Sequence, residues 1–124
     1  FHADSSLSQV APTESRVSLS YVSDPVHPVS SRCNGPTIED GALVHYMSGD
    51  QRCYLSRPDV LTFQTGPLTA DVTFGGEIWA RLNVSTTGSD ADYVVKLIDE
   101  FADSAKLVRG EIMRARFRRS FAEP

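Results

Sequence analysis

The sequence predicts an all-β protein, an antiparallel sandwich of about five to seven strands. Several short segments alternate apolar and polar residues, which is the period of a strand with one buried face. Glycine, proline and small polar residues separate these segments and predict turns. The chain has 124 residues, of which 40% are hydrophobic and 23% are charged. This length and composition are typical of one soluble globular domain and exclude a second full domain.

The first half of the chain contains two predicted strands. Residues 17–22 alternate apolar residues with serines, and residues 60–63 form a short run of strand-forming residues that ends before Gly66. Between them, residues 23–59 hold four prolines and three glycines, which predict one long irregular connection with a short strand at 42–47. Connections of this length are usually functional or lie against another part of the protein.

The second half carries a stronger strand pattern. Ile78, Ala80, Leu82 and Val84 recur at a spacing of two, and we expect them to face the core. The glycines just before them fit either a hairpin turn or a bulge. Residues 93–99 are apolar on both faces, which predicts a strand covered from both sides.

Residues 107–121 fit two structures. Apolar residues alternate with arginines there as in a strand, although the same residues would also mark one side of a helix. We favour a strand because Gly110 would weaken the start of a helix and because every other predicted element is β. The open edges of the resulting sandwich would need covering.

The two cysteines, Cys33 and Cys53, lie too far apart and are too few for a zinc site. Whether they pair is left open, with two free thiols favoured. A disulfide between them would contribute about 3 kcal/mol by the chain-entropy estimate in an oxidising compartment.

The charge balance argues against two classes of partner. The 16 acidic and 12 basic residues give a formal net charge of −4, whereas nucleic-acid binding relies on clustered excess Lys and Arg. No apolar run is long enough to cross a bilayer, so we expect neither a nucleic-acid nor a membrane partner. The basic residues near the end predict either a contact with an acidic surface or a solvated face: Arg109, Arg114, Arg116, Arg118 and Arg119.

No catalytic residue, metal site or cofactor is predicted. The chain lacks the Gly-x-Ser-x-Gly run of a serine nucleophile, and its histidines, His2, His27 and His45, are expected at the surface. Asp90 and Asp92 lack the later glutamate and central glycine of an EF-hand, so we interpret them as turn-capping residues.

Four aromatic residues offer one further binding hypothesis. Trp79, Tyr46, Tyr54 and Tyr93 could form a platform on which a sugar stacks. Packing in the core is the favoured interpretation. A stand-alone carbohydrate- or ligand-binding module is therefore kept as the alternative function.

Blocks of the sequence resemble a known family. Tyr-Val-Ser-Asp-Pro at 21–25 and Arg-Pro-Asp-Val-Leu-Thr-Phe at 57–63 are similar to the C-terminal domain of the X-Pro dipeptidyl-peptidase and cocaine esterase class of serine hydrolases. The α-amino acid ester hydrolases and glutaryl-cephalosporin acylases resemble the chain most. Further blocks agree in the same order, at residues 28–29, 50–52, 67–69, 71–73, 85–99 and 109–118.

The resemblance implies a galactose-binding-like jelly roll, incomplete within these residues, that follows an α/β-hydrolase domain carrying a Ser, Asp and His triad. No position here matches that catalytic motif. The chain would be an accessory domain of a bacterial acyl hydrolase, acylase or peptidase, with the catalytic domain as its partner. A second copy joined through sheet edges is a further expected partner.

We expect this accessory domain to support the catalytic domain and to shape its cleft with residues 23–59 and the turn at 88–92. The compartment stays open between bacterial cytoplasm, periplasm and secretion. The candidate binding or domain-interface residues are Asp24, Tyr46, Arg52, Arg57, Asp90, Asp92 and Tyr93.

Overall fold

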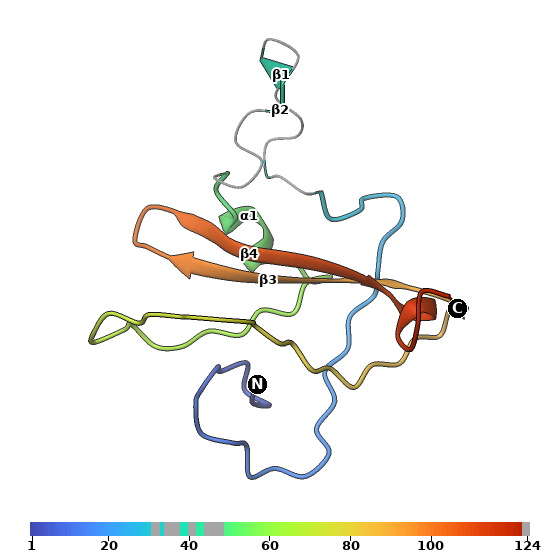
Figure 1. Cartoon of the computed structure of the whole chain (residues 1–124), viewed down its shortest axis with the longest axis horizontal. Helices are drawn as coiled ribbons and strands as arrows, with labels where there is room; N and C mark the ends of the chain where they lie inside the picture. Colours follow the sequence, from blue (N-terminus) through green and yellow to red (C-terminus); the bar gives the residue numbers. More distant parts are fainter. Residues whose placement is uncertain (31–32, 34–37, 40–41, 44–48, 123–124) are drawn as a thin grey trace.

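The structure is a computed structural model, and it describes residues 1–30, 33, 38–39, 42–43 and 49–122. Along the chain, β1 (Ile38–Glu39) and β2 (Ala42–Leu43) precede a four-residue helix, α1 (Arg52–Leu55). Two longer strands follow, β3 (Asp92–Glu100) and β4 (Ala105–Arg114), and the 3-10 turn η1 (Ala115–Phe117) comes after them. Strand residues outnumber helical ones, which confirms the predicted all-β class (Figure 1).

The hairpin of β3 and β4 is the central element of the fold. The strands pair antiparallel from Asp92 opposite Arg114 to Glu100 opposite Ala105, with one bulge. Strand-forming residues in β3 favour the extended backbone, and the backbone N–H of Phe101 donates to Ser104 O at 2.7 Å across the turn. The strand predicted at 93–99 is confirmed.

The strand predicted at 107–121 is confirmed as far as Arg114 and is wrong beyond it. Ala115 still donates its N–H to the backbone oxygen of Ala91, the residue just before β3, at 2.8 Å. The next backbone hydrogen bond runs locally, from Arg118 N to Ala115 O at 3.1 Å. This i to i+3 bond replaces the strand ladder and turns the chain into η1.

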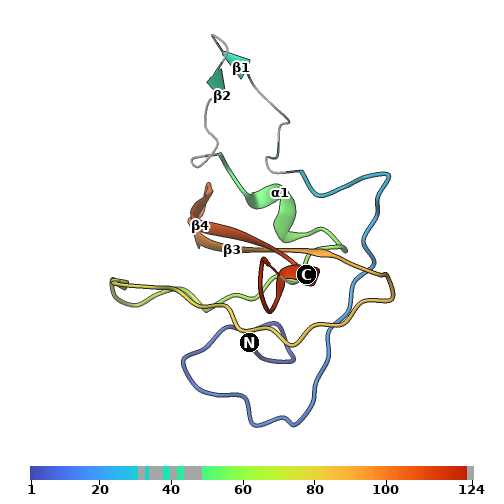
Figure 2. The ribbon, with the colours of Figure 1, turned by 45° about the vertical axis from the view of Figure 1, so that its right-hand side comes forward.

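Helix α1 lies inside the segment that we expected to be irregular. It is too short to produce a helical period, so the sequence pattern did not reveal it. Figures 1 and 2 show α1 on one side of the hairpin and the chain around residues 65–84 on the other side. Among the residues whose burial is described, three are buried: Gln51 and Tyr54 lie at this contact, and Ala105 begins β4.

The same segment also contains β1 and β2. They pair antiparallel, with Ile38 opposite Leu43 and Glu39 opposite Ala42. β2 covers the first two residues of the short strand predicted at 42–47. The rest of that prediction, including Tyr46, lies outside the described residues.

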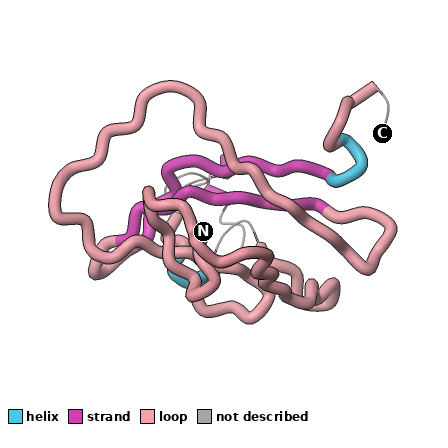
Figure 3. Tube along the Cα trace, turned by 90° about the horizontal axis from the view of Figure 1, so that it is seen from below, coloured by secondary structure: helices cyan, strands magenta, loops and turns pink. Residues whose placement is uncertain are grey.

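Three predicted strands, at residues 17–22, 60–63 and 78–84, are not formed among the described residues. Figure 3 shows that most of the chain outside the β3–β4 hairpin is loop. A strand needs a neighbour whose N–H and C=O groups complete a ladder. In the described part of the chain, only isolated bridges at Ser6–Gln64 and Asp50–Lys106 occur outside the named strands. The described residues thus form four strands, β1 to β4, where the sequence predicted five to seven.

The predicted core face at 78–84 is exposed. Ile78, Leu82 and Val84 keep 57%, 46% and 53% of their surface in solvent. The buried apolar residues that the structure describes are Tyr54 and Ala105. The alternating pattern predicts a face to be buried, but the described part of this chain covers neither these residues nor those between them.

The N-terminal segment is attached to the hairpin through Gln64. Its backbone N–H donates to Ser5 O at 3.1 Å, and its backbone oxygen accepts from Leu7 N at 2.8 Å. Its side-chain Nε2 donates to Glu100 Oε2 at 2.7 Å, at the end of β3. The Phe1 and Phe63 rings, with centroids 4.6 Å apart, pack beside this connection.

Candidate functional site

A buried polar contact holds α1 against the hairpin. Gln51 is fully buried, and its Nε2 donates to Gly49 O at 2.9 Å. Its Oε1 accepts from Lys96 Nζ at 2.8 Å, and its backbone N–H donates to Ala105 O at 2.9 Å. Lys96 Nζ also lies 4.3 Å from the centroid of the Tyr54 ring, at cation–π distance. Partial burial lowers the pKa of Lys96 below its usual value.

Asp50 fixes the start of the same helix. Its Oδ1 accepts from the backbone N–H of Arg52 at 3.0 Å and of Ala105 at 3.1 Å. Its Oδ2 accepts from Arg52 Nε at 2.7 Å. These hydrogen bonds, with that from the Arg52 side chain the largest contribution, lower the pKa of Asp50 to about 2. The predicted interface residue Arg52 is thus held in place while half of its side chain stays exposed.

Cys33 and Cys53 form a disulfide, with Cα atoms 5.5 Å apart. The prediction that favoured two free thiols is therefore wrong. Sequence separation could not decide this, because the approach of two cysteines is set by the path of the intervening chain. The disulfide borders an open hollow of about 430 Å³, which Asp50 and Arg52 also line.

A second polar cluster brings together two predicted site residues, Asp24 and Arg57. Arg57 binds Asp59 through two hydrogen bonds, of 2.7 and 2.6 Å, and also donates to His27 O at 2.8 Å. The carboxylate of Asp24 contacts His27 Nδ1 at 2.9 Å and accepts from Val26 N at 2.8 Å. The Arg57 guanidinium lowers the pKa of Asp59, and the hydrogen bond with His27 lowers that of Asp24.

This cluster joins residues 24–27 to residues 57–59, from the two ends of the long segment. His27 is exposed, as predicted. Its contact with a carboxylate was missed, because Asp24 and His27 meet only through the turn that Pro25 begins.

The third cluster pairs aspartates with arginines at the open end of the hairpin. Arg114 Nε and Nη2 donate to the two carboxylate oxygens of Asp92, at 2.7 and 2.9 Å. Asp90 accepts from the backbone N–H of Arg116 at 3.1 Å and from the Arg116 side chain. These hydrogen bonds lower the pKa of both aspartates. Asp90 also accepts from Ala91 N at 3.0 Å, as the turn-capping interpretation expected.

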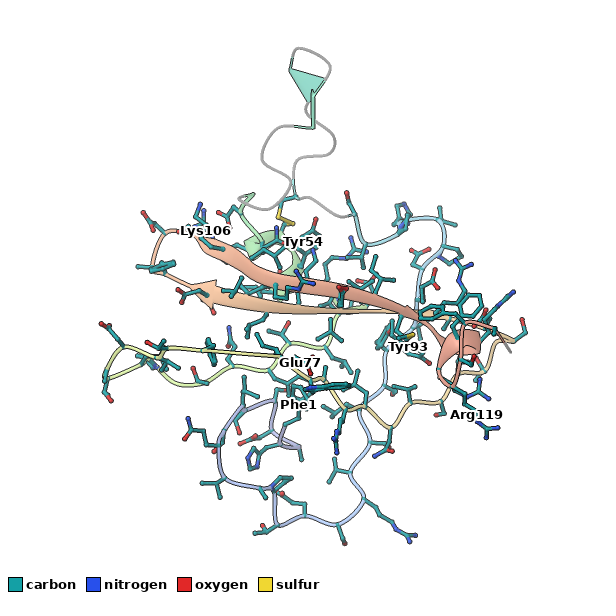
Figure 4. The ribbon with its side chains drawn as sticks, viewed as in Figure 1. Phe1, Tyr54, Glu77, Tyr93, Lys106 and Arg119 are labelled. Atoms are coloured by element: carbon teal, nitrogen blue, oxygen red, sulfur yellow. A yellow bond between two sulfur atoms is a disulfide. The ribbon has the colours of Figure 1, made fainter. Side chains whose placement is uncertain are left out.

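The pairing changes how the basic tail is interpreted. Arg114 and Arg116 neutralise aspartates of this chain, and Arg109 donates to Glu111 at 3.2 Å. Three of the five arginines that we considered for an acidic partner are thus paired with acidic side chains of the domain, and Arg118 donates to Ala115 O at 3.1 Å. Figure 4 shows Arg119 at the far end of the hairpin from Lys106.

The aromatic platform is not assembled. Tyr54 is buried under Lys96, which confirms the core-packing interpretation for this residue. Trp79 is 74% exposed and donates to Glu77 Oε2 at 3.1 Å, so core packing is wrong for it within this chain. Tyr93 is partly exposed and lies opposite Met113, toward the end of the hairpin away from Tyr54 (Figure 4). Tyr46 lies outside the described residues.

The described residues contain no group of three or more His, Cys, Asp or Glu side chains arranged to hold a metal ion. No helix in this part of the chain is both long and apolar enough for a membrane span.

The three polar clusters each tie segments of this chain to one another, and such charge-assisted networks stabilise a fold. Comparison with known proteins shows the family of the domain. Residues 1–124 match the X-Pro dipeptidyl-peptidase C-terminal non-catalytic domain, and the chain belongs to this family.

A curated relative gives the same result. The chain is 34% identical over 108 residues to cocaine esterase of Rhodococcus sp. (strain MB1 Bresler). The match covers 84% of this chain but only 18% of the length of that esterase. No solved structure matches the chain. The resemblance to the family of the X-Pro dipeptidyl-peptidase C-terminal domain and cocaine esterase, inferred from the sequence blocks, is thus confirmed.

Proposed function

We propose that this domain completes a bacterial serine hydrolase that cleaves ester or amide bonds, by supporting the catalytic domain and shaping its cleft. The family and the name of the esterase relative support the reaction class. In such an enzyme a serine attacks the carbonyl carbon, a histidine moves the proton and water resolves the acyl-enzyme. This chain contributes support and surface, and the catalytic domain contributes the reacting groups.

The observation that carries the proposal is the area that the domain leaves uncovered. A compact protein of 13.6 kDa would expose about 6,600 Å², whereas this chain exposes 10621 Å², an excess of about 4,000 Å². Permanent interfaces between protein subunits bury about 2,000–5,000 Å² in total over the two partners, so the excess is at least as large as one partner's share of such an interface. Contiguous exposed apolar surface marks a contact with another protein part.

The apolar part of this surface includes the segment at 68–84, and residues 17–29 are similarly rich in exposed large hydrophobic residues. Between residues 68 and 84, the exposed large hydrophobic residues are Leu68, Val72, Phe74, Ile78, Trp79, Leu82 and Val84. We propose that the catalytic domain, or further strands of the parent protein, cover this segment. The unformed strand at 78–84 would then obtain its missing partner.

Residues 23–59 are proposed to face the cleft. The Asp24–Arg57 cluster and the disulfide hold both ends of this segment, and the half-exposed side chain of Arg52 is fixed by Asp50. Asp90 and Asp92 act differently. Both are bound to arginines of β4 or η1, so we propose that they stabilise the hairpin and have no contact with substrate.

The first experiment measures the intact mass of the polypeptide that carries this sequence, with and without a fluorophosphonate that labels activated serines. We expect a labelled species much larger than 13.6 kDa. An unlabelled species of 13.6 kDa would instead favour an independent binding module, and calorimetry with sugars would then test the alternative.

A second experiment tests the covered surface in the intact protein. Trp79→Ser should lower the melting temperature if the 68–84 segment packs against the catalytic domain. Val10→Ser is the matched control, because Val10 is 71% exposed and Trp79 is 74% exposed. Equal and negligible effects of the two substitutions would contradict the proposed contact.

Pairing of two copies through sheet edges stays a prediction. The described β3–β4 sheet has two strands, so each strand has one edge without a ladder partner in that sheet. Sedimentation of the intact enzyme at several concentrations would reveal a dimer or its absence.

A further inference from the structure

The loop around Trp79 carries an ordered row of charged and aromatic side chains. Trp79 is the single tryptophan of the chain and is 74% exposed. Glu77 and Arg81, two residues before and after it, are exposed as well. From residue 77 to residue 86 the chain runs without a turn or bend. Because an extended chain points every second side chain to the same side, these three side chains share one side of the loop.

A hydrogen bond fixes the first two members of this row. Trp79 Nε1 donates to Glu77 Oε2 at 3.1 Å, which is possible only because both side chains lie on the same side of the chain (Glu77 is labelled in Figure 4). The bond orients the indole ring and engages one of the two carboxylate oxygens. Among the residues that the structure describes, no ion pair includes Glu77 or Arg81. Both charges can therefore pair with a partner.

The opposite side of the same loop is apolar. Ile78, Ala80 and Leu82 alternate with the charged row, and Ile78 and Leu82 are 57% and 46% exposed. This apolar side suits the proposed contact with the catalytic domain. The side that carries Trp79 is thus left for a second contact, with a partner whose charges match it.

The order of the charges on this side is complementary to itself. When two copies of the loop lie antiparallel about a two-fold axis at Trp79, Glu77 of each copy faces Arg81 of the other. The two indole rings meet between the ion pairs. Interfaces of symmetric dimers have this property, since residue i of one copy contacts residue j of the other and the reverse. A parallel arrangement would place Glu77 against Glu77 and Arg81 against Arg81, and like charges repel.

We propose that residues 77–81 join two copies of the parent protein in an antiparallel, two-fold symmetric contact centred on Trp79. Ion pairs between arginine and carboxylate give such a contact its orientation, and stacked aromatic rings exclude water from its centre. Tryptophan and arginine are the residues that contribute most to protein interfaces. One partner of a standard interface contributes about 800 Å², which the excess exposed area of about 4,000 Å² accommodates beside the catalytic domain.

The test reverses one charge at a time in the intact protein and measures the dimer by sedimentation at several concentrations. Glu77→Arg and Arg81→Glu each place like charges opposite one another, so each should raise the dissociation constant of the dimer at least about tenfold. A mixture of the two variants pairs a copy with two arginines and a copy with two glutamates. Dimers should therefore return in the mixture, with a dissociation constant within about threefold of that of the unaltered protein. Their return also shows that both variants are folded.

Glu14→Arg is the matched control, because Glu14 is exposed and the net charge changes by the same amount. This substitution should leave the dimer unchanged.

Three results would overturn the proposal. The first is a monomer at every concentration of the unaltered protein. The second is a dimer that neither charge reversal weakens, which would place the contact elsewhere, for example at the sheet edges. The third is a failure of the mixed variants to pair although each alone is monomeric. The proposed contact with the catalytic domain lies within one polypeptide and does not depend on concentration. A monomeric protein that Trp79→Ser still destabilises would therefore refute the dimer and leave that contact standing.

Discussion

Replacing Gln51 by alanine should detach α1 from the hairpin. The substitution removes a hydrogen bond to Gly49 O and one from the Lys96 ammonium, at a position with no solvent exposure. The neutral bond contributes about 1 kcal/mol and the charged one about 1.5–3 kcal/mol. Because Lys96 is only partly buried and can recover water, we expect a net loss of about 2–3 kcal/mol.

Hydrogen exchange measures this loss directly. A change of about 2–3 kcal/mol corresponds to about 30- to 160-fold faster exchange wherever local opening limits it. The increase should occur in residues 49–57 and at the start of β4, where Gln51 N donates to Ala105 O. Gln9→Ala is the matched control, because Gln9 is exposed. Less than a threefold change on Gln51→Ala would refute the reasoning that this amide holds the helix.

Three further outcomes are expected. The pKa of Asp50 is lowered to about 2 from an ordinary 3.8. The ionised carboxylate of Asp50 therefore contributes its full stabilisation above about pH 4, and this stabilisation is lost as the pH falls toward about 2. Exchange in α1 should therefore rise between about pH 4 and pH 2, and Asp50→Asn should flatten that pH profile. Gly76 has φ +92°, a backbone conformation that strains an L-residue, so Gly76→Ala should cost about 1–2 kcal/mol in a denaturant titration while Gly75→Ala changes little. Gly110→Ala should leave the stability unchanged or raise it by up to about 1 kcal/mol, because the new Cβ would meet Leu107 at an ordinary 3.7 Å. A lower melting temperature of this variant would contradict the expectation.

The hairpin was the most predictable part of the fold. Residues 93–99 are apolar and strand-forming over a long run, and β4 supplies a neighbour close in sequence. Such a pair of strands needs few contacts from elsewhere in the chain, because a short turn brings the two strands together. The strands at 17–22, 60–63 and 78–84 have a comparable pattern but no ladder among the described residues.

The sequence predicted which residues belong to the candidate site, but it did not predict which partners they bind. Asp24, Arg57, Asp90 and Asp92 were selected, yet their partners His27, Asp59, Arg116 and Arg114 follow from turns and strand register. A shift of the hairpin register by one residue would place Asp92 and Arg114 on different faces. The structure therefore adds what the sequence did not reveal, that both aspartates form ion pairs within the domain.

Gln51 was missed as a structural residue. A buried glutamine has no sequence signal of its own, because its type is common at the surface. It is buried only because Gly49, Lys96 and Ala105 meet its polar groups, and these residues lie up to 54 positions away in the chain. Helix α1 depends on the same contacts, which explains why local propensity could not reveal it.

The sequence by itself determined the β class, the hairpin strand at 93–99, the family, and the lack of a recognisable serine-nucleophile motif. These features depend on local composition, on residue spacing and on blocks that occur in a shared order. The tertiary structure alone decided the disulfide, the buried contact under α1, the pairing of each aspartate and the exposure of the 68–84 segment. Each of these depends on which distant segments meet in space, and an apolar pattern specifies a face to be covered without specifying what covers it.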